Sequence, residues 1–173
     1  MGDAGNDLIF GNDGNDLLYG GDDSDTLIGG AGDDVLNGGA GVDYLIGDGG
    51  DDILYGEDGA DVLVGLSGDD TIHGDAGNDT IAAGDGDDLI YAGDDDDYVY
   101  GEADSDEIYG GAGDDYIDGG AAVDTIDGEN GDDRIHGGSG GDTINGGNDD
   151  DSIYGDEGND NLNGDAGSDA LVG

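Results

Sequence analysis

The amino-acid sequence predicts an all-β protein in which short parallel strands stack into a solenoid. Three observations predict this class: a period of nine residues from residue 2 to residue 172, one aliphatic residue at a fixed place in each period, and turn-forming residues at most other places. Such periodicity is typical of solenoids, in which each unit packs mainly against its neighbours. We therefore expect residues 2–172 to form a single array of nineteen nonapeptides.

Two places in the nonapeptide are occupied without exception. When the chain is divided from Gly2, position 6 is Asp in all nineteen units and position 8 is Leu, Ile or Val in all nineteen. Position 1 is Gly except at Ala83 and Ala92, and position 4 is Gly in fourteen units. A typical unit is Gly110-Gly-Ala-Gly-Asp-Asp-Tyr-Ile-Asp118.

The chemistry of the nine positions predicts one turn and one short strand in each unit. Gly, Asp and Asn at positions 1 to 6 are turn residues, because they tolerate backbone conformations with positive φ. Positions 7 to 9 alternate around the aliphatic residue and are rich in Val, Ile, Thr and Tyr, which favour strands. A strand of three residues is stable only when parallel copies stack at about 4.8 Å.

The charge of the chain excludes several functions and points to cations. Forty-eight Asp and Glu residues face one Arg and no Lys, giving a formal net charge of −47. Nucleic-acid binding needs cationic side chains, and no apolar run is long enough to span a membrane. The N-terminal residues do not resemble a conventional secretory signal, and the absence of Cys excludes disulfides and thiolate metal sites. Carboxylates in this number favour a hard cation, chiefly calcium.

The position-6 aspartates are the candidate calcium ligands. A turn former alone does not require Asp in every unit, whereas position 5 varies among Asn, Asp, Ser, Val, Ala and Gly. Calcium binds six to eight oxygens, including carboxylates and backbone carbonyls, and a Gly-rich turn offers both. The candidate ligands are Asp7, Asp16, Asp25, Asp34, Asp43, Asp52, Asp61, Asp70, Asp79, Asp88, Asp97, Asp106, Asp115, Asp124, Asp133, Asp142, Asp151, Asp160 and Asp169. The other aspartates, at positions 2, 3, 5 and 9, are expected to be solvating charge or to lie just outside the direct ligands.

The repeat resembles the RTX (repeats-in-toxin) calcium-binding family, whose nonapeptide is G-G-x-G-x-D-x-U-x, where U is a large aliphatic residue. The resemblance implies a right-handed parallel β-roll with two repeats per coil, so that odd and even units form opposite sheets. It also implies that each calcium ion lies between units i and i+2, pairing Asp7 with Asp25 and Asp16 with Asp34. At most seventeen such sites exist, and full occupancy would change the net charge from −47 to −13.

Departures from the consensus are expected to weaken calcium binding locally. They cluster at Ala83, Ala92, Asp95, Asp104 and Ala122. Asp adopts a left-handed turn at some cost, and Ala adopts it less readily. We expect the lowest calcium affinity and the earliest local unfolding in this stretch, which hydrogen exchange along the chain would detect.

The sequence favours a structural role over catalysis. His73 and His136 both occupy position 9 and are seven units apart, so they are expected to face outward on opposite sheets. No nucleophile or acid–base pair is evident. The leading hypothesis is a calcium-dependent module of an extracellular protein, since the resemblance implies export through a bacterial type I system. The alternatives are a recognition surface of the adhesin or ice-binding type, and an accessory module of a secreted enzyme. A flanking domain or capping segment is a possible partner.

Overall fold

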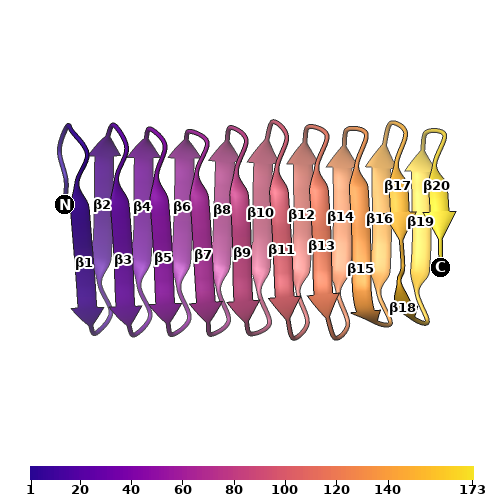
Figure 1. The fold of residues 1–173 in the computed structure, drawn as a ribbon, viewed down its shortest axis with the longest axis horizontal. Helices are drawn as coiled ribbons and strands as arrows, with labels where there is room; N and C mark the ends of the chain where they lie inside the picture. The colour runs from indigo at the N-terminus through magenta and orange to yellow at the C-terminus, as the bar shows by residue number, and fades with distance from the viewer.

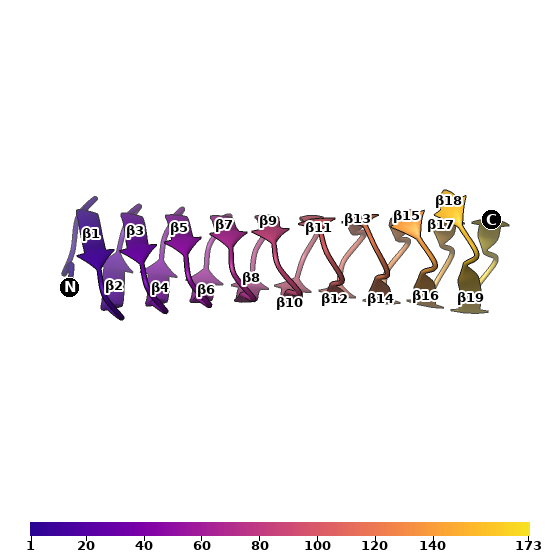
Figure 2. The same cartoon turned by 90° about the horizontal axis from the view of Figure 1, so that it is seen from below.

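The chain is an all-β solenoid with two parallel sheets and no helix. The computed structural model describes residues 1–173, and the coils follow one another in chain order along one axis (Figure 1). The two sheets face each other, with the eleven-stranded sheet along one side and the nine-stranded sheet along the other (Figure 2). None of the segments is a helix with the length and apolar character needed to cross a membrane.

The strands alternate between the two sheets. The eleven-stranded sheet contains β1 (Leu8–Asp13), β3 (Thr26–Ala31), β5 (Tyr44–Gly49), β7 (Val62–Ser67), β9 (Thr80–Asp85), β11 (Tyr98–Ala103), β13 (Tyr116–Ala121), β15 (Arg134–Gly140), β17 (Ser152–Tyr154), β18 (Glu157–Gly158) and β20 (Ala170–Val172). The nine-stranded sheet contains β2 (Leu17–Asp22), β4 (Val35–Ala40), β6 (Ile53–Asp58), β8 (Thr71–Ala76), β10 (Leu89–Asp94), β12 (Glu107–Ala112), β14 (Thr125–Asn130), β16 (Thr143–Asn148) and β19 (Asn161–Ala166).

The register repeats every eighteen residues. Strand β3 pairs with β5 in parallel, placing Leu27 beside Leu45, and β4 pairs with β6, placing Leu36 beside Leu54. Each residue therefore lies beside the same nonapeptide position two units along the chain. This arrangement confirms a parallel β-roll with two repeats per coil.

The strands are longer than the sequence predicts. The prediction that positions 1 to 6 are all turn residues is wrong, because most strands span six residues and include positions 1 to 3 of the next unit. In β10, for example, Leu89, Ile90 and Tyr91 are followed in the same strand by Ala92, Gly93 and Asp94. Stacked neighbours hold these residues in the parallel ladder, although φ at position 2 is positive. Only positions 4 to 6 remain as the turn.

The position-8 side chains form the core, as the sequence predicts. From Leu18 to Ile153 they are at most 3 % exposed and belong to one continuous cluster between the two sheets. Ala83 and Ala92 at position 1 also lie in this cluster. At the ends of the roll Ile9 and Leu162 are only partly buried, and Leu171 is 43 % exposed. Each nonapeptide therefore contributes one aliphatic side chain to the core, and that side chain is fully buried only where there is a coil on both sides of it.

Position 2 requires a left-handed backbone in every unit from Asn12 onward. Gly occupies this position in half of these units, and acidic or amide side chains occupy all of the others but one. Leu66 is the exception, because it has φ of 83° with a bulky side chain that is 46 % exposed. A left-handed conformation costs a non-Gly residue about 1–2 kcal/mol, so Leu66 is a point of backbone strain.

We expect the substitution Leu66→Gly to stabilise the calcium-loaded protein by about 1 kcal/mol, because relief of strain exceeds the entropic cost of Gly. The measurement is the thermal midpoint followed by circular dichroism. Leu89→Gly is the matched control, since Leu89 at position 7 has no positive φ and Gly there weakens a strand. A lower midpoint for Leu66→Gly would contradict the assignment of strain.

Candidate metal centre

The position-6 aspartates form two rows, one along each edge of the roll. In each row the backbone N–H of one Asp donates to Oδ1 of the Asp eighteen residues later, as in Asp7 to Asp25 at 2.7 Å and Asp16 to Asp34 at 2.7 Å. This contact recurs for every consecutive pair in both rows, at 2.7–3.1 Å. The structure therefore brings together all the pairs that the i and i+2 arrangement requires.

Fifteen of these carboxylates are buried. The residues from Asp25 to Asp151 at position 6 are at most 3 % exposed, whereas Asp7, Asp16, Asp160 and Asp169 at the ends are partly exposed. Burying an ionised carboxylate is costly unless it is paired or coordinates a metal. The rows thus hold part of the negative charge of the chain in buried places, where a counter-ion has the largest effect.

The second oxygen of each buried carboxylate lacks a partner. Oδ1 accepts the backbone N–H, but Oδ2 has no hydrogen bond in any of the fifteen buried residues. An unsatisfied buried polar atom is rare in a folded protein and needs an explanation. One oxygen per turn is therefore held in place and remains available to a cation.

Backbone carbonyls supply further oxygen atoms near each Oδ2. A Cβ placed on Gly110 would lie 2.7 Å from Oδ2 of Asp115 and 2.7 Å from the carbonyl oxygen of Gly128 in the next coil. No three acidic or His side chains are placed so that they could hold one metal ion by themselves, so a cation at any level would need main-chain carbonyls beside the carboxylates. This mixed oxygen donor set is the kind that calcium uses.

The same geometry explains the Gly at position 1 and corrects one expectation. Ala83 and Ala92 were expected to disturb left-handed turns, but φ at position 1 is not positive. Position 1 favours Gly for a different reason: a Cβ would approach the carboxylate of the same unit and the carbonyl of the next coil. Asp95, Asp104 and Ala122 at position 4 do have positive φ, of 77°, 70° and 87°. Whether these coils bind calcium more weakly stays a prediction.

We expect Gly110→Ala to destabilise the roll by roughly 1–3 kcal/mol, the usual cost of overpacking, and to weaken calcium binding. The added methyl would press on Oδ2 of Asp115. Gly141→Ala is the matched control, because a Cβ there would lie 3.6 Å from its nearest neighbour, the carbonyl oxygen of Asn159. Thermal unfolding and calcium titration, both followed by circular dichroism, measure the two effects. Equal thermal and calcium midpoints for the two variants would contradict a steric requirement for Gly at position 1.

Burial raises the pKa of the aspartates in the middle of the roll. Loss of hydration on burial is the main cause of these raised pKa values. The bond from the preceding N–H lowers the pKa, and neighbouring carboxylates raise it further. The pKa rises to about 8 for Asp97, Asp106 and Asp133, to about 7 for Asp52, Asp70, Asp79 and Asp88, and to about 6 for Asp61, Asp115 and Asp124. A divalent cation beside these groups would favour the ionised form.

Position 5 carries a second pair of acidic rows that the sequence did not distinguish from solvating charge. The N–H of Asp69 donates to Oδ1 of Asp51, and the N–H of Asp132 donates to Oδ1 of Asp114, at 3.0 and 2.9 Å. These carboxylates are exposed and satisfy turn N–H groups in the next coil. The position-5 carboxylates are therefore solvated groups that also stabilise the turns.

The two His residues lie on opposite sheets, as expected. His73 is on β8 and stacks between Tyr55 and Tyr91, with ring centroids 4.9 and 5.0 Å apart. His136 is on β15, where its Nδ1 lies 2.9 Å from Asp156. The two imidazoles therefore do not share a site.

The fold and the rows of aspartates define a class: a parallel β-roll with a row of buried carboxylates along each edge. The model of the RTX calcium-binding nonapeptide repeat matches eight segments, at residues 1–27, 19–54, 55–90, 73–108, 91–126, 100–135, 109–144 and 136–171. The chain belongs to the RTX calcium-binding repeat family. The curated proteins contain no match to this chain.

Proposed function

We propose that the chain is a structural module that folds when calcium binds between its coils. The observation that carries this proposal is the set of fifteen buried Oδ2 atoms without a hydrogen-bond partner. The nineteen position-6 aspartates would be the carboxylate ligands, with backbone carbonyls completing the coordination. Each ion would join an Asp to its neighbour in the next coil, which allows at most seventeen sites.

The charge of the chain supports coupling between binding and folding. With a net charge of −47 and buried carboxylates, the compact state is opposed by repulsion and by loss of hydration. Ions that bind only the folded state stabilise it by mass action, and a site assembled by folding couples the two processes. Residues 2–172 would then behave as one folding unit that is disordered without calcium.

We also propose an extracellular location, as a module of a secreted bacterial protein exported through a type I system. The family to which the chain belongs supports this, because RTX repeats are typical of such proteins. An unfolded chain in a low-calcium compartment would then fold where calcium is abundant. The role we propose is structural rather than catalytic.

A calcium titration of chelator-treated protein tests the function. We expect a cooperative change from coil to β structure in far-ultraviolet circular dichroism, with a midpoint of roughly 10⁻⁴ to 10⁻³ M, as for extracellular calcium modules. Magnesium is the control ion, because it demands octahedral geometry and releases its water reluctantly. A chain that is already β-rich in chelator at neutral pH would contradict coupled folding. A midpoint far below micromolar calcium would contradict the extracellular role.

A further inference from the structure

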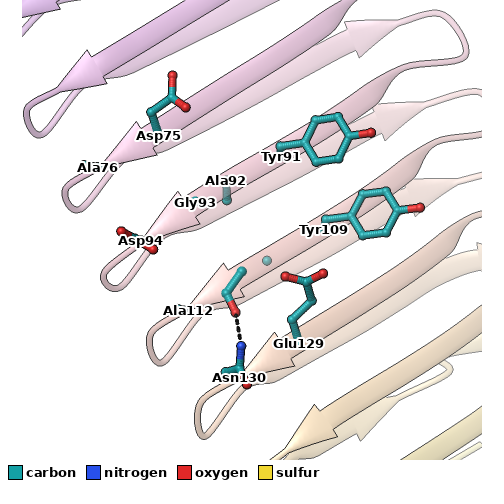
Figure 3. A pocket seen from close by; sticks show the side chains of 12 residues that line it. Asp75, Ala76, Tyr91, Ala92, Gly93, Asp94, Tyr109, Ala112, Glu129 and Asn130 are labelled. Atoms are coloured by element: carbon teal, nitrogen blue, oxygen red, sulfur yellow. Dashed lines mark hydrogen bonds between the residues drawn. The ribbon is translucent and has the colours of Figure 1, made fainter.

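The outer face of the nine-stranded sheet contains a hollow that the calcium rows do not explain. Its volume is about 540 Å³, and Tyr91 and Tyr109 lie along one side of it (Figure 3). Three carboxylates line the same hollow: Asp75 and Glu129 at position 2, and Asp94 at position 3 next to the turn. It lies on the sheet surface, away from the buried position-6 side chains.

The hollow exists because two neighbouring coils lack a side chain at position 2. The register along the sheet runs from Asp75 through Gly93 and Gly111 to Glu129. The two Gly residues leave a bare backbone floor, and the carboxylates close its two ends. Three strand spacings separate the ends, or roughly 14 Å between their Cα atoms.

Stacking holds the tyrosine wall rigid. Tyr55, His73, Tyr91 and Tyr109 stack in series, with centroid separations of 4.9, 5.0 and 5.1 Å and interplanar angles of 6–11°. The ring faces contact one another, so their edges are left to face outward and toward the hollow. Tyr91 and Tyr109 are the two of these rings that line the hollow, and their wall over two coils suits a narrow, apolar body.

The end carboxylates have no cationic partner within the chain. The one salt bridge joins His136 and Asp156 on the other sheet. Burial and the charge of Glu57 raise the pKa of Asp75, against a smaller opposing effect of His73. A cation bound beside Asp75 would stabilise its ionised carboxylate and so offset both the loss of hydration and the repulsion from Glu57.

We propose that this hollow binds a linear aliphatic diammonium or polyamine cation, with one ammonium group at Asp75, the other at Glu129, and the methylene chain against Tyr91 and Tyr109. A single metal ion cannot reach both carboxylates at this separation. A second hollow on the same sheet has one Gly at position 2, Gly147, and is lined mainly by Asn and acidic residues. It lacks the aromatic wall and the two-coil floor, so the fit is specific to the first hollow.

Isothermal titration calorimetry on the calcium-saturated chain, at physiological ionic strength, tests the proposal with diaminooctane as probe. We expect saturable binding near one molecule per chain, and weaker binding of octylamine, which has the same methylene chain but one charge. Glu129→Gln should weaken diaminooctane binding about fivefold, the scale of one exposed ion pair. Tyr109→Thr should weaken it further by removing the wall, with circular dichroism verifying the fold of each variant.

Glu102→Gln is the matched control, because Glu102 also occupies position 2 with positive φ but lies on the opposite sheet. It should leave binding unchanged. Equal weakening by Glu129→Gln and Glu102→Gln would show diffuse attraction to an acidic chain and overturn the proposal. Equal affinity for octylamine and diaminooctane, or no saturable binding, would overturn it as well.

Discussion

Replacing Asp133 by Asn is expected to remove two calcium ions and to destabilise the calcium-loaded roll by roughly 3–5 kcal/mol, the cost of breaking a buried charge pair. Asp133 is 2 % exposed and lies between Asp115 and Asp151 in its row. Asn preserves the shape, and its Oδ1 can still accept the N–H of Asp115. The variant therefore isolates the contribution of one negatively charged oxygen.

The same substitution is expected to have the opposite sign without calcium. Burial raises the pKa of Asp133 to about 8, so its ionised form opposes folding when no cation is present. Asp133→Asn should therefore increase residual β structure in chelator at neutral pH. A reversal of sign between the two conditions would distinguish a calcium ligand from a merely structural aspartate.

The matched control is Asp132→Asn, which changes the neighbouring exposed carboxylate at position 5. Its Oδ1 accepts the N–H of Asp150, a bond that Asn can also accept. We expect little change in calcium stoichiometry or midpoint for this variant. If calorimetry found that Asp133→Asn binds as many calcium ions as the unmodified chain, Asp133 would not be a calcium ligand.

Lowering the pH is expected to promote folding in the absence of calcium. The pKa values of about 6 to 8 in the folded state exceed the ordinary Asp value of 3.8. The folded state therefore binds more protons than the unfolded state over this range. The resulting stabilisation is fully present below about pH 4 and is lost as the pH rises through 6 to 8. Each such carboxyl contributes on the order of several kcal/mol.

Circular dichroism in chelator between pH 8 and pH 4 measures this effect, with light scattering to separate folding from precipitation near the isoelectric point of about 4.1. With calcium present, protons compete with the ion for the same carboxylates. The calcium midpoint should therefore rise as the pH falls below about 8. A calcium midpoint that does not depend on pH would place the ions away from these buried groups.

The period of nine predicted stacked parallel strands, and the resemblance to the RTX family implied two repeats per coil. Leu27 and Leu45, eighteen residues apart, occupy the same place in the repeat, and the structure puts them side by side in the core. The pairing of Asp7 with Asp25, which the resemblance implied, is present in the structure. In a solenoid, residues in contact between neighbouring coils are always separated by the same number of residues in the sequence. The repeat pattern therefore predicts both the local structure and the contacts between coils.

The tertiary structure alone decided which atoms crowd one another between coils. The sequence showed that Gly recurs at position 1, but the turn explanation was wrong: the cause is Oδ2 of an Asp five residues later and a carbonyl one coil away. The six-residue strands were also missed, since Gly and Asp at positions 1 to 3 are poor strand formers that parallel neighbours hold in the ladder.

The hollow beside Tyr91 was likewise invisible in the sequence, because Gly93 and Gly111 look like any other glycines of the repeat. Only the register places them between the carboxylates of Asp75 and Glu129. The sequence by itself thus determined the fold, the core and the identity of the candidate ligands, which repeat with the period. The structure decided burial, unsatisfied oxygens and surface shape, because these depend on distances between coils that no single nonapeptide contains.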